Sequence, residues 1–256
     1  MICPAYNESE NLPRLIEAVA AALDQYNYEI IIVDDGSSDD TLMVLEGLVE
    51  KYSCLRHLSF TRNFGHQNAL MAGLRSAKGE CVVMLDADMQ HPPSLIIDML
   101  AKWRSGFKVV QGLRQEKSSG LKALTSKWFY GLVSIMSDVP ITLGTSDFRL
   151  LDRTIVDHIN TLDRPVFLRG YIPWLGYETC FLSYTSNARY KGKAKYSFGK
   201  MIKLSSEGIT IQSTFPLGLS RFMGAIVSVL AFFTCCLPFI FIFSRMQQYL
   251  AGRVFR

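Results

Sequence analysis

A run of 23 residues without a charged side chain, Phe222 to Ser244, sets the strongest limit on how this chain can fold. At about 1.5 Å per residue, a helix of this length reaches roughly 35 Å, and the apolar core of a bilayer is about 30 Å thick. The alternative, a buried helix of a soluble protein, is usually shorter than such an uninterrupted run. Pro238 predicts a kink, which membrane helices tolerate. We therefore predict one transmembrane helix over residues 221–244.

The residues on either side of this run divide the rest of the chain. Residues 179–206 contain no acidic side chain but six basic ones, which fit either a solvated face or a surface beside anionic lipid. Residues 198–211 alternate apolar residues with lysines, which suits a helix in the membrane interface or, alternatively, a helix packed on a core. We predict a globular domain over 1–196, an amphipathic juxtamembrane segment over 197–220 and a short tail over 245–256.

The first 114 residues alternate strand-like and helix-like patterns. The runs at 29–35, 54–60, 81–88 and 108–114 are apolar or rich in β-branched residues, and amphipathic stretches separate them. This alternation predicts an α/β fold, a mostly parallel sheet with helices on both faces. The chain opens with only a short apolar stretch before Pro4, which predicts an incomplete first strand. Residues 115–148 have a helical pattern, and residues 149–185 are mixed.

Pairs of aspartates follow two of the predicted strands. Asp34 and Asp35 end one strand, and Asp86 and Asp88 end another. Because alternate residues of an extended segment point to the same side, Asp86 and Asp88 can converge on one point, where two carboxylates repel unless a cation lies between them. A hard ion such as Mg²⁺ or Mn²⁺ meets that need and keeps positions open for phosphate oxygens. Helix capping or a turn is the alternative role, and for Asp34 or Asp35 alone it is as good an explanation.

Several classes of function are disfavoured. There is no G-x-G-x-x-G after the first strand and no P-loop, so dinucleotide cofactors and P-loop chemistry are not indicated. Six cysteines and four histidines show no zinc-like spacing, and we expect reduced thiols. The net charge of +4 is modest, and we expect no nucleic-acid partner.

Seven motifs in order carry a family resemblance over roughly residues 2–245: "CPAYNESENL", "IIVDDGSSDDT", "SFTRNFGHQNALMAGL", "MLDADMQHPP", "SDFRLLDR", "FLRGYIPWLGY" and "RYKGKAKYS". Together they resemble the family 2 glycosyltransferases of the GT-A fold, and among these the polyprenyl-phosphate glycosyltransferases. The resemblance implies transfer of one sugar, with inversion, from a nucleotide-sugar donor such as UDP-glucose to undecaprenyl or another polyprenyl phosphate. It also implies a metal-dependent enzyme, with Mg²⁺ or Mn²⁺, for modification of a cell-surface glycan.

The resemblance assigns roles to matching positions. Asp86 and Asp88, with Gln90, would hold the metal, and Asp147 and Asp88 would lie at the reacting centre. For Asp147 the resemblance leaves three roles open, those of a base, a ligand of a sugar hydroxyl and a positioning residue. The structural alternative is that Asp147 pairs with Arg149. The donor would be bound by Pro4, Tyr6, Glu8, Asp35 and Asp86. The acceptor phosphate or the donor diphosphate would be bound by Arg149, Arg189 and Lys195. Structure or pocket lining, not chemistry, is expected of His66, His91 and Trp174.

The chain departs from the family pattern in places. Ala194 stands where a polar residue is usual, and one predicted span replaces the two that many relatives carry. A truncated, non-catalytic remnant that binds nucleotide sugar or partners a flippase is therefore the alternative function. A processive polysaccharide synthase is disfavoured because no Q-x-x-R-W motif is present. We expect an inner-membrane protein with its catalytic domain on the cytoplasmic side, and a homo-oligomer is possible.

Overall fold

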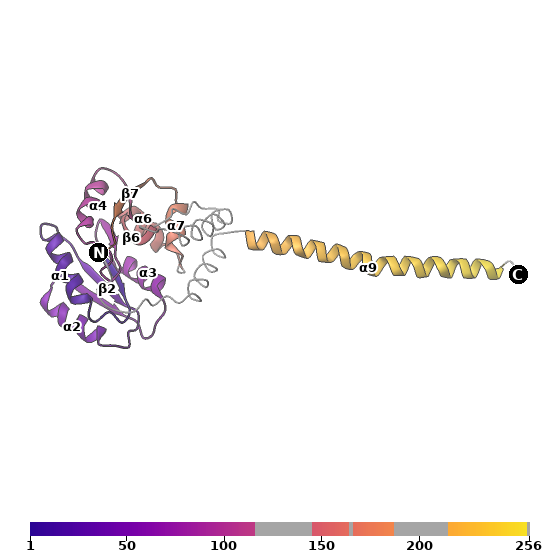
Figure 1. Cartoon of the computed structure of the whole chain (residues 1–256), viewed down its shortest axis with the longest axis horizontal. Helices are drawn as coiled ribbons and strands as arrows, with labels where there is room; N and C mark the ends of the chain where they lie inside the picture. Colours follow the sequence, from indigo (N-terminus) through magenta and orange to yellow (C-terminus); the bar gives the residue numbers. More distant parts are fainter. Residues whose placement is uncertain (116–144, 164–165, 187–214, 255–256) are drawn as a thin grey trace.

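The computed structural model describes residues 1–115, 145–163, 166–186 and 215–254, and its centre is a seven-stranded sheet (Figure 1). The strands lie in the order β3-β2-β1-β4-β6-β5-β7. Their bounds are β1 Ile2–Ala5, β2 Ile30–Asp34, β3 Leu55–Ser59, β4 Cys81–Met84, β5 Val109–Arg114, β6 Thr145–Asp152 and β7 Thr179–Tyr184. Neighbours β1, β2, β3 and β4 run parallel, as do β5 and β7, so the mostly parallel sheet predicted from the sequence is confirmed.

The first strand is short, as predicted, but it lies in the middle of the sheet. β1 has four residues, all buried, and pairs with β2 on one side and β4 on the other. Ile2 pairs with both Ile31 and Met84. Although β1 is short, it lies between two strands, and its apolar side chains on both faces are removed from water, which stabilises it.

Helices cover both faces of the sheet. Alternation along β2 shows the two layers, since Ile30 and Ile32 belong to one core and Ile31 and Val33 to the other. The first core is closed by α1 Leu12–Leu23, α2 Thr41–Lys51 and α4 Leu95–Arg104. The second core is closed by α3 His66–Ser76, α6 Arg153–Asn160 and α7 Leu168–Trp174. This arrangement leaves the carboxyl ends of β1, β2 and β4 at one edge of the sheet, where ligands bind in folds of this class.

Strand β6 corrects the sequence-based interpretation. Residues 145–148 were expected to be helical, but they begin a strand inserted antiparallel between β4 and β5. Met84 pairs with Arg149, and Val83 with Leu150. Continuing this register by two residues places Asp147 opposite Asp86, so the antiparallel insertion brings a carboxylate from far along the chain to the acidic end of β4. The rest of the predicted helical region, 116–144, lies outside the described residues.

Helix α9, Phe215–Val254, contains the predicted membrane segment and is longer than it. Ser220–Met246 forms a stretch of 27 residues, and its most apolar window of 18 residues has a mean hydropathy of 2.6 and no buried residue. The helix continues through Pro238. By length and composition this one helix, among the described residues, is able to cross a membrane. The predicted amphipathic stretch at 198–211 lies outside the described residues.

Candidate functional site

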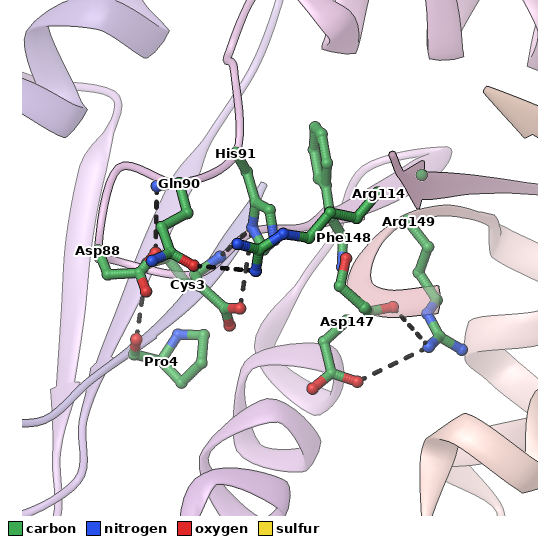
Figure 2. Close-up of polar contacts among 12 residues, drawn as sticks. Cys3, Pro4, Asp88, Gln90, His91, Arg114, Asp147, Phe148 and Arg149 are labelled. Atoms are coloured by element: carbon green, nitrogen blue, oxygen red, sulfur yellow. Dashed lines mark hydrogen bonds and ion pairs between the residues drawn. The ribbon is translucent and has the colours of Figure 1, made fainter. Parts of the chain in front are cut away.

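The acidic loop that follows β4 forms the centre of the candidate site. The Asp86 backbone N–H lies 3.3 Å from His91 Nδ1, and the Gln90 N–H donates to Asp88 Oδ1 at 3.1 Å. Met89, between them, has a positive φ of 63°, which costs energy in a residue other than glycine. The loop therefore folds back on itself and holds Asp88, Gln90 and His91 around the end of the strand (Figure 2).

The charge of Asp86 is poorly compensated in this loop. Its side chain is 29% exposed, yet Oδ1 is buried and lacks a hydrogen-bond partner within the described part of the chain. Burial raises the pKa of the Asp86 carboxyl; His91 and His66 oppose this rise, and Asp147 and Asp88 add to it. A buried carboxylate oxygen without a donor, close to a second carboxylate, is the environment that a divalent cation stabilises.

The donor set fits a divalent metal with few protein ligands. Among the described residues no group of three or more His, Cys, Asp or Glu side chains is arranged to hold a metal ion. Two carboxylates, those of Asp86 and Asp88, fit an ion such as Mg²⁺ that fills its other positions with water and phosphate oxygens. The amide oxygen of Gln90 instead accepts from Arg114 Nη1 at 3.4 Å, so the geometry supports Gln90 less than the two aspartates.

Asp147 lies beside this loop and is surrounded by cationic side chains. Arg169 holds its carboxylate with two hydrogen bonds, Nε to Oδ1 at 2.9 Å and Nη2 to Oδ2 at 2.8 Å. His66 Nε2 lies 3.0 Å from Asp147 Oδ2 and 3.8 Å from Asp86 Oδ1. Burial alone would raise the pKa of Asp147, but the Arg169 charge and the hydrogen bonds from His66 and Arg169 hold that pKa well below its usual range. The carboxylate is therefore an anion at neutral pH, with both oxygens engaged.

Arg149, two residues after Asp147 in β6, is a buried cation close to the Asp147 carboxylate. Its side chain is 2% exposed, lies 3.7 Å from Asp147 Oδ1 and donates to the Ser146 carbonyl at 3.0 Å (Figure 2). Burial lowers the pKa of this guanidinium to about 10, so it stays charged at neutral pH. The predicted contact of Arg149 with a phosphate remains a prediction. Its contacts in the described part of the chain include Asp147 and the Ser146 carbonyl. The other two predicted phosphate-binding residues, Arg189 and Lys195, lie outside the described residues.

The predicted donor-binding residues gather where β1 and β2 end. Pro4 is buried in β1, and Tyr6 and Glu8 follow it in a partly exposed loop. This loop is tied to the turn after β2, since Asn7 N–H donates to Ser37 Oγ at 2.9 Å. The chain thus brings the loops after two parallel strands together beside the acidic loop.

Asp35 organises the third loop of this edge. Its buried carboxylate accepts hydrogen bonds from the backbone N–H groups of Phe64 at 2.7 Å and of Gly65 at 3.0 Å. Gly36, at φ 66°, lies so close to Arg62 that an added Cβ would be 2.3 Å from that residue's carbonyl carbon. Asp35 therefore acts on the loop before α3, and a direct contact with a nucleotide remains a prediction.

The structure brings in residues that the sequence reasoning did not assign. His66, expected to be structural, lies between two carboxylates, and Arg169 pairs with Asp147. The "FLRG" motif was the available signal for Arg169, but nothing in its local pattern gives its partner. His91 stacks on Phe148 at 4.8 Å between ring centroids, a packing role, whereas Trp174 is 65% exposed and stacks on Tyr171 at 5.6 Å.

Comparisons with known proteins agree with this geometry. Residues 1–165 match the family described as Glycosyl transferase family 2. The chain is 37% identical over 235 residues to the uncharacterized glycosyltransferase YkcC of Bacillus subtilis, covering 89% of this chain and 72% of that protein. It is 35% identical over 237 residues to the prophage bactoprenol glucosyl transferase homolog of Escherichia coli, covering 91% and 78% respectively.

A solved structure shows a similar fold. The mannosyltransferase PcManGT from Pyrobaculum calidifontis, in complex with GDP-Man and Mn²⁺, superimposes with a TM-score of 0.54 at 21% identity. The match covers 75% of this chain and 57% of that structure. At this identity the likeness concerns the fold.

Proposed function

Because the chain belongs to glycosyl transferase family 2 and is a glycosyltransferase of the GT-A fold, we propose that it transfers one sugar from a nucleotide-sugar donor to a polyprenyl phosphate at a membrane. The relatives named bactoprenol glucosyl transferase support this acceptor, since they match over 91% of the chain. The donor proposed is UDP-glucose or a similar nucleotide sugar.

One observation carries the proposal: among the described residues, a buried carboxylate oxygen of Asp86, which follows β4, has no hydrogen-bond donor, and His66 lies between this carboxylate and that of Asp147. A nucleotide-sugar donor has two phosphates between the nucleoside and the sugar. Their charge can be held at an acidic site only through a cation. The loops after β1 and β2 lie beside this point and have the side chains that the resemblance assigns to the nucleoside.

The proposed reaction needs no strong base. An oxygen of the acceptor phosphate attacks the anomeric carbon, a new carbon–oxygen bond forms on the face opposite the leaving group, and the anomeric configuration inverts. The bond to the donor diphosphate breaks, and its electron pair stays on the departing diphosphate. Because the attacking phosphate is already anionic, no proton has to be removed from it. The protein's task is to hold two anions in line and to stabilise the leaving charge.

A divalent cation, Mg²⁺ or Mn²⁺, would supply that charge stabilisation at the diphosphate when bound by Asp86 and Asp88. Asp88 accepts the N–H of Gln90, which fixes the orientation of its carboxylate toward the loop. His66 lies 3.8 Å from Asp86 Oδ1 and adds positive charge beside it when protonated. The structural neighbour solved with GDP-Man and Mn²⁺ supports a metal of this class.

We place the reaction at the cytoplasmic face of a plasma membrane, with α9 as the anchor. The exposed apolar surface of α9 is what a lipid environment covers, and a polyprenyl acceptor resides in the same bilayer. Self-association remains a prediction from the sequence.

Membranes that contain the full chain test this proposal. We expect label from one radiolabelled nucleotide sugar to enter the organic phase with undecaprenyl phosphate and Mg²⁺ or Mn²⁺. The label should disappear with a chelator and fall at least 100-fold in Asp88→Asn, because one carboxylate no longer holds the ion. Arg75→Lys, an exposed change on α3, is the matched control and should keep full transfer. Binding of a nucleotide sugar without transfer from any donor would refute the proposed transfer reaction. It would favour the alternative of a non-catalytic remnant that only binds nucleotide sugar.

A further inference from the structure

Asp147, Arg169 and His66 form a charged cluster, and the proposed reaction gives no role to Asp147 or Arg169. The Asp147 carboxylate is 1% exposed and both of its oxygens are engaged, one by Arg169 and the other by Arg169 and His66. A general base must reach the proton it removes and must have an oxygen available to accept it. Asp147 meets neither condition in this arrangement, so we infer its role from the side chains that it binds.

What Asp147 holds most firmly is the guanidinium of Arg169. The pair is bidentate, with both contacts under 3 Å, which fixes the plane of the guanidinium as well as its position. Arg169 stands in the first turn of α7, and its contact ties that helix to β6 across 22 residues of sequence. A flexible arginine thus becomes an oriented one.

The oriented guanidinium is partly exposed and is connected through Asp147 and His66 to Asp86, one of the two carboxylates proposed to bind the metal. Asp147 Oδ2, which accepts from Arg169, also contacts His66 Nε2, and His66 in turn lies 3.8 Å from Asp86 Oδ1. Arg169 is therefore separated from Asp86 by only two residues, Asp147 and His66, along this path of contacts. In contrast to the buried Arg149, its side chain is 39% exposed, so a solute can approach it.

We propose that Arg169 binds the phosphate of the acceptor and that Asp147 is the positioning residue that orients it. The inference rests on the proposed function and adds to it the residue that binds the phosphate of the acceptor. A guanidinium can donate hydrogen bonds to more than one anion at the same time, and its planar geometry matches that of a phosphate. The acceptor phosphate is the anion that must come to lie beside the sugar, and an exposed guanidinium is accessible to it.

The charge balance of the cluster fits this role. Without Asp147, Arg169, Arg149 and His66 would bring cations together near the sheet edge. With it, Arg169 remains a cation with a fixed orientation, and an incoming phosphate meets a guanidinium that is already oriented. A purely structural ion pair between α7 and β6 is the alternative, and it predicts a different kinetic result.

Steady-state kinetics of the full chain in membranes separates the two. In Arg169→Lys, which keeps the charge but loses the fork, we expect the acceptor KM to rise by about 10- to 100-fold while the donor KM changes less than twofold. Asp147→Asn should raise the acceptor KM in the same way. The double variant should lose less than the product of the two single effects, because both act through one contact. Arg75→Lys is the control.

The outcomes are distinguishable. A fall in kcat at unchanged acceptor KM in Asp147→Asn would overturn the inference and make Asp147 a base or a sugar ligand. A parallel loss for donor and acceptor, together with lower thermal stability, would identify a structural ion pair. Absence of transfer by the unaltered chain would refute the proposed function itself, before any variant is compared.

A measurement on the unaltered chain covers the case in which the variants do not fold. Phenylglyoxal modifies exposed arginines, and peptide mass spectrometry reports each site. We expect undecaprenyl phosphate, but not undecaprenol, to slow modification of Arg169 at least threefold, with Arg75 modified equally in all samples. Equal modification of Arg169 with and without the phosphate-bearing lipid would overturn the inference.

Discussion

Replacing Gly36 by alanine should destabilise the donor side of the site. Gly36 has φ 66°, and its missing Cβ would lie 2.3 Å from the carbonyl carbon of Arg62. A side chain at this φ costs about 1–2 kcal/mol, and forcing a methyl group into packed backbone costs about 1–3 kcal/mol more. Since Arg62 leads directly to Phe64, whose N–H donates to Asp35, the displacement should also loosen that loop.

Gly47→Ala is the matched control for this change. Gly47 lies in the middle of α2, and nothing is within 4 Å of the position of its added Cβ. Alanine there should stabilise the helix by about 0.5–1 kcal/mol, because it restricts the unfolded chain and favours helix.

Thermal unfolding of the full chain in detergent measures both variants. At about 2–4 °C per kcal/mol for a protein of this size, Gly36→Ala should lower Tm by roughly 4–20 °C and Gly47→Ala should raise it slightly. Gly36→Ala should also weaken nucleotide-sugar binding, measured by calorimetry. Equal Tm values for the two variants would refute the reasoning from backbone conformation and contact.

Two further predictions concern acid stability and the membrane. Asp152 accepts from Thr154 N–H at 3.0 Å and from Trp103 Nε1 at 2.8 Å; although burial alone would raise its pKa, these bonds and the Lys108 charge lower that pKa to about 2. Because the pKa of Asp152 is lower in the folded chain than its unfolded value near 3.9, ionised Asp152 stabilises the fold above pH 3.9, and this contribution is lost as the pH falls toward 2. The Tm advantage of the unaltered chain over Asp152→Asn should therefore shrink between pH 5 and pH 2. A constant difference in Tm would contradict this. Leu230→Arg places a charge within the apolar stretch of α9 at a cost of about 3 kcal/mol, so less protein should resist carbonate extraction than with Leu217→Arg outside that stretch, and equal resistance would contradict a spanning helix.

Local patterns were sufficient to predict the parallel half of the fold. Each strand from β1 to β5 appears as an apolar run, and the helices between them have the spacing of one apolar face, as in α1 with Leu12, Leu15 and Ile16 buried. These features depend on neighbours in sequence, which is why a single chain reveals them.

The antiparallel insertion could not be predicted in the same way. The sequence pattern predicts helix up to residue 148 and a mixed structure after it, whereas the strand "TSDFRLLD" buries two charged side chains, those of Asp147 and Arg149. Their burial is stabilised by each other and by Arg169, a partner that lies on α7. The pairing of Met84 with Arg149 brings Asp147 toward the acidic loop after β4, and no local spacing in the sequence predicts this pairing.

The acidic motif shows the same division. The pair at Asp86 and Asp88 was predicted from its position after a buried strand, and the structure brings both to the sheet edge as expected. His66 was not predicted to join them, because it follows a different strand and begins α3. The sequence indicated which residues bear charge, and the fold determines which of these meet.

The most direct test of the account compares two acceptors that differ only in the phosphate. The full chain in lipid nanodiscs would receive radiolabelled nucleotide sugar, a divalent metal and either undecaprenyl phosphate or undecaprenol. The account predicts labelled lipid with the phosphate, none above background with the alcohol, and an inverted anomeric configuration in the product. Equal labelling of both lipids, or label in neither while the chain binds nucleotide sugar, would contradict the claim that an acceptor phosphate is the nucleophile.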